Sequence, residues 1–152
     1  MPQNEEERAY RMAERSLALR SHSAHELRKK LLMKGICEEA AERVISRLSE
    51  KKYLDDRRFA GEYIEYGFLR KSWGMVKVRA GLMARGIARE IIDEALSDPN
   101  IRDIEVMGAR RFVEKNLRHK SMIDDAYREE LQKKLKGRGY NWEVVSLVTR
   151  EL

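Results

Sequence analysis

Histidine and cysteine are the residues of this chain with the most specific chemistry, and there are few of them. His22 and His25 lie three residues apart, and Cys37 is the only cysteine, so these side chains could in principle meet one zinc ion. A structural zinc site takes four ligands of this kind, and no second histidine pair is present to complete it. We therefore expect no metal site, and we expect Cys37 to have a packing or capping role at a helix start.

The adjacent carboxylates Asp55 and Asp56 could form a metal site or an acid/base pair. Their position before a helical pattern favours a simpler role, with Asp55 as the N-cap and Asp56 in the first turn. The chain has no phosphate-binding glycine loop, no dinucleotide fingerprint and no Ser/His/Asp or Cys/His arrangement that stands out. The sequence therefore predicts neither an enzyme nor a bound cofactor.

Basic residues form the more informative pattern, because they gather in windows that lack acids. No Asp or Glu occurs between Glu65 and Glu90, and shorter windows of the same kind lie near residues 28–34 and 133–138. Middle helices facing one way would turn these windows into a basic stripe. The predicted partner-binding residues are Lys29, Lys30, Lys34, Arg70, Lys71, Lys77, Arg79, Arg85, Arg89, Lys133, Lys134 and Arg138. The main contacts are expected at Arg70, Lys77, Arg79 and Arg85, with outer contacts at Lys29, Lys34, Lys133 and Arg138.

A threefold repeat must position these windows. A leucine, a basic residue and a glycine recur at Leu31, Lys34 and Gly35, with offsets of 51 and then 53 residues to Gly86 and Gly139. A fixed period of this length is typical of stacked helical repeats. Each glycine should end a helix in the left-handed C′ conformation.

The repeat predicts an all-α, elongated array of three tandem three-helix units, nine helices in all. We place the units at residues 5–50, 51–98 and 99–152, after a disordered N-terminus at residues 1–4. Capping boxes are expected at Ser23 with Glu26 and at Ser121 with Asp124. In the first unit, helices are expected over residues 5–19, 24–34 and 38–49. In the second unit, the first helix starts at Asp55, the second runs from Gly74 to Arg85 and the third ends at about Leu96. In the third unit, the first helix covers 101–119, the second ends at Arg138 and the third covers 142–152.

Charge and composition narrow the class of partner. The net charge of +6 favours a polyanion, either nucleic acid or an acidic protein surface. The helices after Gly35 and Gly86 are acidic, as in Glu38, Glu39 and Glu42, so phosphates would repel them if they entered a DNA groove. No apolar run is long enough for a membrane span, and the polar N-terminus is unlike a targeting peptide. We expect a cytoplasmic protein that does not bind membranes.

Three stretches give the chain a resemblance to a known family. They are A-L-R-S-H-S-A-H-E-L-R-K-K-L at 18–31, K-Y-L-D-D-R-R-F-A at 52–60 and W-G-M-V-K-V-R-A-G-L-M-A-R-G-I at 73–87. They resemble the RecX family, bacterial regulators of the RecA recombinase. The resemblance is strong over residues 9–96, whereas the third unit matches in register and helix pattern with few identities.

The resemblance implies a curved array of three-helix repeats that lies in the groove of the RecA–DNA filament. It further implies inhibition of RecA ATP hydrolysis, strand exchange and coprotease activity, without catalysis by the regulator itself. We expect a monomer whose partners are the RecA filament and nonspecific single- or double-stranded DNA. The alternatives are a nonspecific DNA-binding repeat protein without a filament partner, and a helical adaptor in which the basic stripe is incidental.

Overall fold

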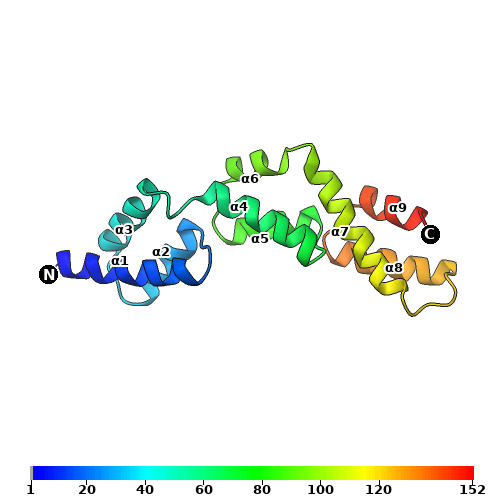
Figure 1. The fold of residues 1–152 in the computed structure, drawn as a ribbon, viewed down its shortest axis with the longest axis horizontal. Coiled ribbons are helices and arrows are strands. Elements are labelled where there is room, and N and C mark those ends of the chain that lie inside the picture. Colours follow the sequence, from blue (N-terminus) through cyan, green and yellow to red (C-terminus); the bar gives the residue numbers. More distant parts are fainter. Residues whose placement is uncertain (1) are drawn as a thin grey trace.

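The computed structural model describes residues 2–152, and over this range it contains only helices. Figure 1 shows them as three groups in a row along the long axis. The first group is α1 (Pro2–Leu19), α2 (Ala24–Met33) and α3 (Glu38–Glu50). The second is α4 (Asp56–Glu65), the π-helical turn η1 (Tyr66–Arg70), α5 (Met75–Ala84) and α6 (Arg89–Leu96). The third is α7 (Asn100–Leu117), α8 (Asp125–Gly137) and α9 (Trp142–Arg150). We call these groups the first, second and third units.

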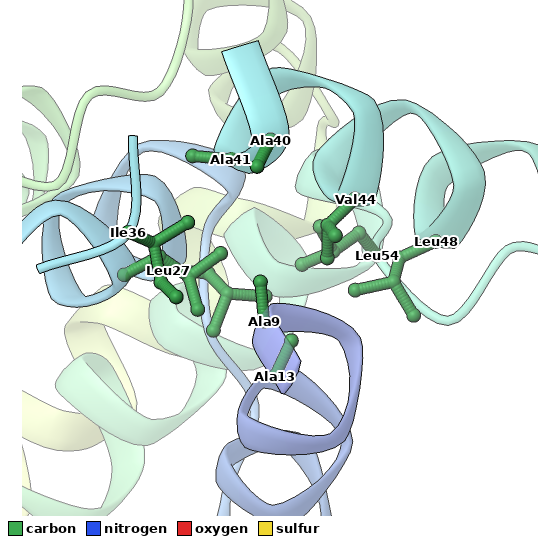
Figure 2. Packing of buried hydrophobic residues seen from close by; sticks show 10 residues of the cluster. Ala9, Ala13, Leu27, Ile36, Ala40, Ala41, Val44, Leu48 and Leu54 are labelled. Carbon is green, nitrogen blue, oxygen red and sulfur yellow. The ribbon is translucent and has the colours of Figure 1, made fainter. Parts of the chain in front are cut away.

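Each unit has its own hydrophobic core. In the first unit Ala9 and Ala13 of α1 lie against Leu27 of α2 and Val44 of α3, and all four side chains are fully buried (Figure 2). The cores do not follow the predicted unit boundaries strictly. Leu54 packs in the first core, and Ile101 of α7 packs in the second. Neighbouring units therefore share a few residues at their edges, as stacked repeats do.

The three repeated glycines end the middle helix of each unit, as the sequence predicted. Gly35, Gly86 and Gly139 have φ values of +87°, +71° and +94°, in the left-handed region that side chains with a Cβ disfavour. After each turn an N–H reaches back into the helix, as from Ile36 to the carbonyl of Leu31 at 3.1 Å. The chain is thereby redirected into the third helix of the unit.

Two local predictions were wrong, and the π-helical turn η1 was not predicted. Residues 2–4 are helical rather than disordered, because proline is well tolerated in the first turn of a helix; Met1 lies outside the described residues. The cap of α8 is Asp124, which accepts from the N–H of Tyr127 at 2.8 Å, and not Ser121. The second unit continues α4 into η1, in which Lys71 N donates to Tyr66 O over five residues.

The units are joined in the same way twice. At the first junction the start of α2 lies on the Gly86 turn: Ser23 Oγ donates to Arg85 O at 2.6 Å, and Ala24 N donates to Asp56 Oδ1 at 2.9 Å. The start of a middle helix thus contacts the glycine turn of the next unit. A carboxylate on the first helix of that unit accepts its first N–H.

At the second junction the start of α5 lies on the Gly139 turn. Gly74 N donates to Arg138 O at 2.8 Å, and Val76 N donates to Gly139 O at 3.1 Å. Met75 N donates to Glu105 Oε1 at 2.9 Å, which repeats the role of Asp56. In addition, η1 packs along α7, whereas no helix packs along another across the first junction of the described chain.

Candidate partner-binding surface

A cationic hollow lies at the second junction, between η1 and α7. It has a volume of about 830 Å³. Its basic lining residues are Arg70 and Lys71 at the end of η1, Arg111 and Lys115 on α7, and Arg138 at the end of α8. The two units therefore build this hollow together, and neither would form it alone.

Two of these arginines shape the hollow by bonding to the end of η1. Arg111 Nη1 donates to Leu69 O at 2.7 Å. Arg138 Nε donates to Ser72 O at 2.9 Å, its Nη2 donates to Lys71 O, and its guanidinium lies 4.7 Å from the ring centre of Phe112. These bonds satisfy carbonyls that the helix end leaves without partners.

The other three cations are exposed and are available to a ligand. Arg70, Lys71 and Lys115 make no ion pair among the described residues, although Lys71 Nζ lies 5.6 Å from the ring centre of Tyr66. Tyr66 is 45% exposed and also lines the hollow. Glu62 and Glu65 line its other side. Three unpaired cations beside an exposed aromatic ring can hold phosphate groups and stack a base.

The structure distributes the remaining predicted residues of the central window differently. Arg79 Nη1 is 2.7 Å from Asp93 Oδ1, and Arg89 Nε is 3.8 Å from Asp93 Oδ2. Arg85 lies at the first junction, where its Nε is 3.4 Å from Glu26 Oε1 and its guanidinium stacks on Tyr63. Part of the positive charge of this window is therefore used within the protein.

Lys77 remains exposed, with its Nζ 5.2 Å from the ring centre of Trp73. Lys29, Lys30 and Lys34 of the first unit line a separate hollow of about 610 Å³ together with the exposed Met33. In the third unit Lys133 is exposed on α8, away from the residues of the cationic hollow.

Lys134, the last of the predicted basic residues, forms an ion pair on α8: its Nζ lies 3.3 Å from Oε1 of Glu130, one turn earlier.

Two of the residues considered for metal or acid/base chemistry, His22 and Asp55, have structural partners. His22 is buried, its Nδ1 lies 2.9 Å from Arg20 O, and burial lowers its pKa. Asp55 caps α4 by accepting from Arg57 N at 3.1 Å and Arg58 N at 3.2 Å, which confirms the predicted N-cap. Within residues 2–152 no group of three His, Cys, Asp or Glu could hold a metal ion. In that range no helix is both long and apolar enough to cross a membrane.

The sequence reasoning missed Tyr66, Arg111 and Lys115. Arg111 and Lys115 are four residues apart and therefore lie on one face of α7, which was a usable signal. They were overlooked because Glu114 interrupts the basic run, so that no acid-free window marks this helix. Tyr66 was given no role from the sequence, because its place beside these cations depends on the π-helical turn that follows α4.

Comparison with known proteins identifies the family. Residues 9–48 match the model of the first three-helix domain of RecX, and residues 55–96 match that of the second. The chain belongs to the RecX family. The Regulatory protein RecX of Pelodictyon phaeoclathratiforme is 36% identical over 100% of this chain and 93% of its own length. That of Chlorobaculum tepidum is 36% identical over 86% of this chain and 79% of its own length.

The fold comparison agrees with this assignment. The crystal structure of RecX from Lactobacillus salivarius matches with a TM-score of 0.84 at 19% identity, over 98% of this chain and 97% of that chain. A second RecX crystal structure matches with a TM-score of 0.82 over 96% of this chain and 73% of that one. The predicted all-α, elongated repeat array is therefore confirmed, and with it the predicted membership of the RecX family, whose named relatives are regulatory proteins.

Proposed function

We propose that this RecX family protein regulates RecA by binding in the groove of the RecA–DNA filament. There it lowers ATP hydrolysis, strand exchange and coprotease activity, and so limits recombination and the SOS response. It acts as a cytoplasmic monomer, and it contributes no catalytic group or cofactor of its own. Family membership supports the regulatory role, and the array form suits an extended partner.

The cationic hollow is the observation that carries the proposed contact. Arg70, Lys71 and Lys115 are exposed cations without carboxylate partners, and Tyr66 exposes its ring beside them. A strand held in a protein filament presents closely spaced phosphates to such a hollow. Phosphates bound by three cations release counterions, so binding should weaken steeply as salt is raised.

The predicted basic stripe extends this contact in both directions. Lys77 lies on the next helix of the second unit, and Lys29, Lys30 and Lys34 are exposed on the first. We place them as outer contacts to the filament, with Lys133 and Lys134 on the third unit. Arg85 and Arg138 contribute by holding the units at their junctions, since their guanidinium groups are already bonded there.

Nonspecific DNA binding without RecA is the second candidate, and the same hollow favours it. A phosphate-binding surface beside an aromatic ring also suits free single strands. The two functions predict different relative affinities for filament and naked DNA, because a filament regulator should bind the assembled filament much more tightly than naked DNA.

The test is DNA-dependent ATP hydrolysis by the cognate RecA with increasing amounts of this protein. The first variant reverses three charges of the hollow, as Arg70→Glu, Lys71→Glu and Lys115→Glu. The control reverses three exposed cations that are not among the proposed contacts, as Arg15→Glu, Lys136→Glu and Arg150→Glu. Both variants have the same net charge, which removes the bulk charge as an explanation.

We expect the hollow variant to need at least tenfold more protein for half inhibition, while the control shifts by less than threefold. Thermal midpoints should stay close to wild type in both, because all six side chains are exposed. Equal loss in both variants would mean that general charge, and not the hollow, makes the contact. Full inhibition by the hollow variant would contradict the proposed surface.

A further inference from the structure

Two of the three glycine turns contact the preceding unit of the chain. The Gly86 turn receives the start of α2, and the Gly139 turn receives the start of α5. The approach is close: a Cβ on Gly86 would lie 2.3 Å from His25 Cγ, and a Cβ on Gly139 would lie 2.6 Å from Lys77 Cβ. The glycines are therefore needed for the fit between units as well as for the turn.

The first unit has the same turn with nothing against it. A Cβ on Gly35 would meet no atom within 4 Å. Lys34, which precedes it, is exposed, whereas the residues at the same position in the other two units, Arg85 and Arg138, bond to the preceding unit. No residue in the described range donates to the carbonyl oxygens of Lys34 or Gly35. Glu5 occupies the repeat position of Asp56.

Glu5 bonds within its own unit instead. Its Oε1 accepts from Cys37 N at 2.9 Å, and this bond lowers the pKa of the Glu5 carboxyl. Asp56 and Glu105 accept from the first N–H of the preceding unit's middle helix. The carboxylate that would receive an incoming helix is thus present in the first unit.

We propose that the Lys34–Gly35 turn is a docking site for the N-terminal turn of an α-helix of RecA. The proposal rests on the proposed function for the identity of the partner, and on the two internal junctions for the geometry. The docked helix places its free N–H groups on the carbonyls of the turn, where the dipoles of the two helix ends attract each other. A carbonyl or carboxylate just before that helix accepts from Lys34.

The internal junctions define which helix fits. Its N-cap is a small residue, because Ser23 and Gly74 hold this position in the two internal copies. A second copy of this chain does not offer such an end. In the third unit the cap of α8, Asp124, lies fifteen residues before Gly139, whereas the caps of α2 and α5, Ser23 and Gly74, lie twelve residues before their glycines. The extra turn and its acidic start, Asp124 with Asp125, keep that end from fitting.

The first experiment uses a fluorescein-labelled helical peptide with the sequence of residues 71–85, which docks on the Gly139 turn within the chain. Its binding to the full-length protein is followed by fluorescence anisotropy. The test variant is Gly35→Asn, because asparagine tolerates positive φ while its side chain occupies the docking space. Gly137→Asn is the matched control, since a Cβ there also meets nothing within 4 Å.

We expect saturable binding to wild type and to Gly137→Asn, and at least tenfold weaker binding to Gly35→Asn. A peptide carrying Gly74→Val should not bind, because a Cβ at this position lies 2.3 Å from the backbone of the glycine turn in the internal copy. Absence of binding to wild type, or equal binding to Gly35→Asn, would overturn the docking site.

The second experiment replaces the peptide by RecA–DNA filaments and by the same DNA alone. Gly35→Asn should weaken filament binding at least fivefold and leave the affinity for DNA unchanged. Equal filament affinity of wild type and Gly35→Asn would overturn RecA as the occupant. If the peptide result holds but wild type does not bind filaments, the docking site stands and the proposed function fails. Self-association that is abolished by Gly35→Asn would identify a second copy as the occupant, against the proposal.

Discussion

The two junctions use the same geometry but different chemistry. At the first junction a serine hydroxyl and an ion pair join the units, through Ser23 to Arg85 and Arg85 to Glu26. At the second, backbone N–H groups of Gly74 and Val76 bond directly to the next turn. Two arginine side chains and the packing of η1 on α7 add to the second junction.

This difference indicates where the array is stiff. Backbone hydrogen bonds fix position more closely than long side chains, whose ordering costs conformational entropy. We therefore expect the second and third units to move as one body, with the cationic hollow held in a fixed shape between them. The first unit can adjust its angle, which would let it follow a partner of variable pitch.

The largest expected effect is at the glycine turns. Gly139→Ala should lower the free energy of unfolding by about 3 kcal/mol, because left-handed strain adds to overpacking against the Lys77 backbone. Gly86→Ala should cost about 2 kcal/mol, since it meets only the His25 side chain, and Gly35→Ala about 1 kcal/mol. Urea unfolding followed by circular dichroism measures this order. A cost at Gly35 equal to that at Gly139 would contradict the comparison.

A smaller difference should separate the two arginines that precede the glycines. Arg138→Ala should cost about 2 kcal/mol, because it removes two charge-assisted bonds to carbonyls and the stacking on Phe112. Arg85→Ala should cost about 1 kcal/mol, since its ion pair is partly exposed to water. The same unfolding measurement applies, and the reverse order would mean that the first junction is the stronger one.

Ser23→Ala should destabilise the chain by about 1 kcal/mol, because Ser23 both caps α2 at Glu26 N and donates to Arg85 O. Ser23→Gly loses both bonds as well, but glycine is a better N-cap than alanine, so it should cost less than Ser23→Ala. Ser46→Ala, an exposed position on α3, is the control. A thermal midpoint of Ser23→Ala equal to that of the wild type would exclude the hydroxyl as the joining group.

The smallest expected effect is an increase in stability when Glu105 is replaced by glutamine. Glu105 is 1% exposed, and burial raises the pKa of its carboxyl, although the bond from Met75 N opposes this. Because the folded chain holds this proton more tightly than the unfolded chain, the charged form weakens the fold at neutral pH. Glu105→Gln keeps an acceptor for Met75 N and should stabilise the protein by up to about 1 kcal/mol at pH 7.

The pH dependence provides the check on Glu105. The contribution of wild-type Glu105 improves as pH falls through its raised pKa towards the ordinary value of 4.5, so the advantage of the glutamine variant should shrink over that range. Glu114→Gln, at an exposed site on α7, should show no such trend. A destabilised Glu105→Gln protein at pH 7 would show that the charge itself holds the second junction.

The fold was largely predictable because its signals are local. The glycine period, the serine cap at Ser23 and the cap at Asp55 each act within a few residues, so the sequence displays them directly. The turn η1 was not predictable in this way. Its path depends on contacts of Gly67 with the side chains of Trp73 and Val78. These contacts form only when α4 and α5 pack together.

The candidate site was predictable only in part, for the same reason. Arg70 and Lys71 stand in the acid-free window, but the residues facing them on α7 come from another unit. The sequence could not separate exposed cations from those used internally either. Arg79 meets Asp93 only because the Gly86 turn brings α5 and α6 into contact, and Arg138 reaches Ser72 across a junction. Charge runs record how many cations are present, whereas packing decides which remain available.

The most direct test of the account compares binding to the RecA–DNA filament and to naked DNA of the same sequence at two salt concentrations. We expect the wild-type protein to bind the filament at least tenfold more tightly than the DNA, with an affinity that falls as salt rises. Reversal of Arg70, Lys71 and Lys115 should reduce filament binding and flatten the salt dependence. Equal affinity for filament and naked DNA would contradict RecA regulation as the function and would favour nonspecific DNA binding.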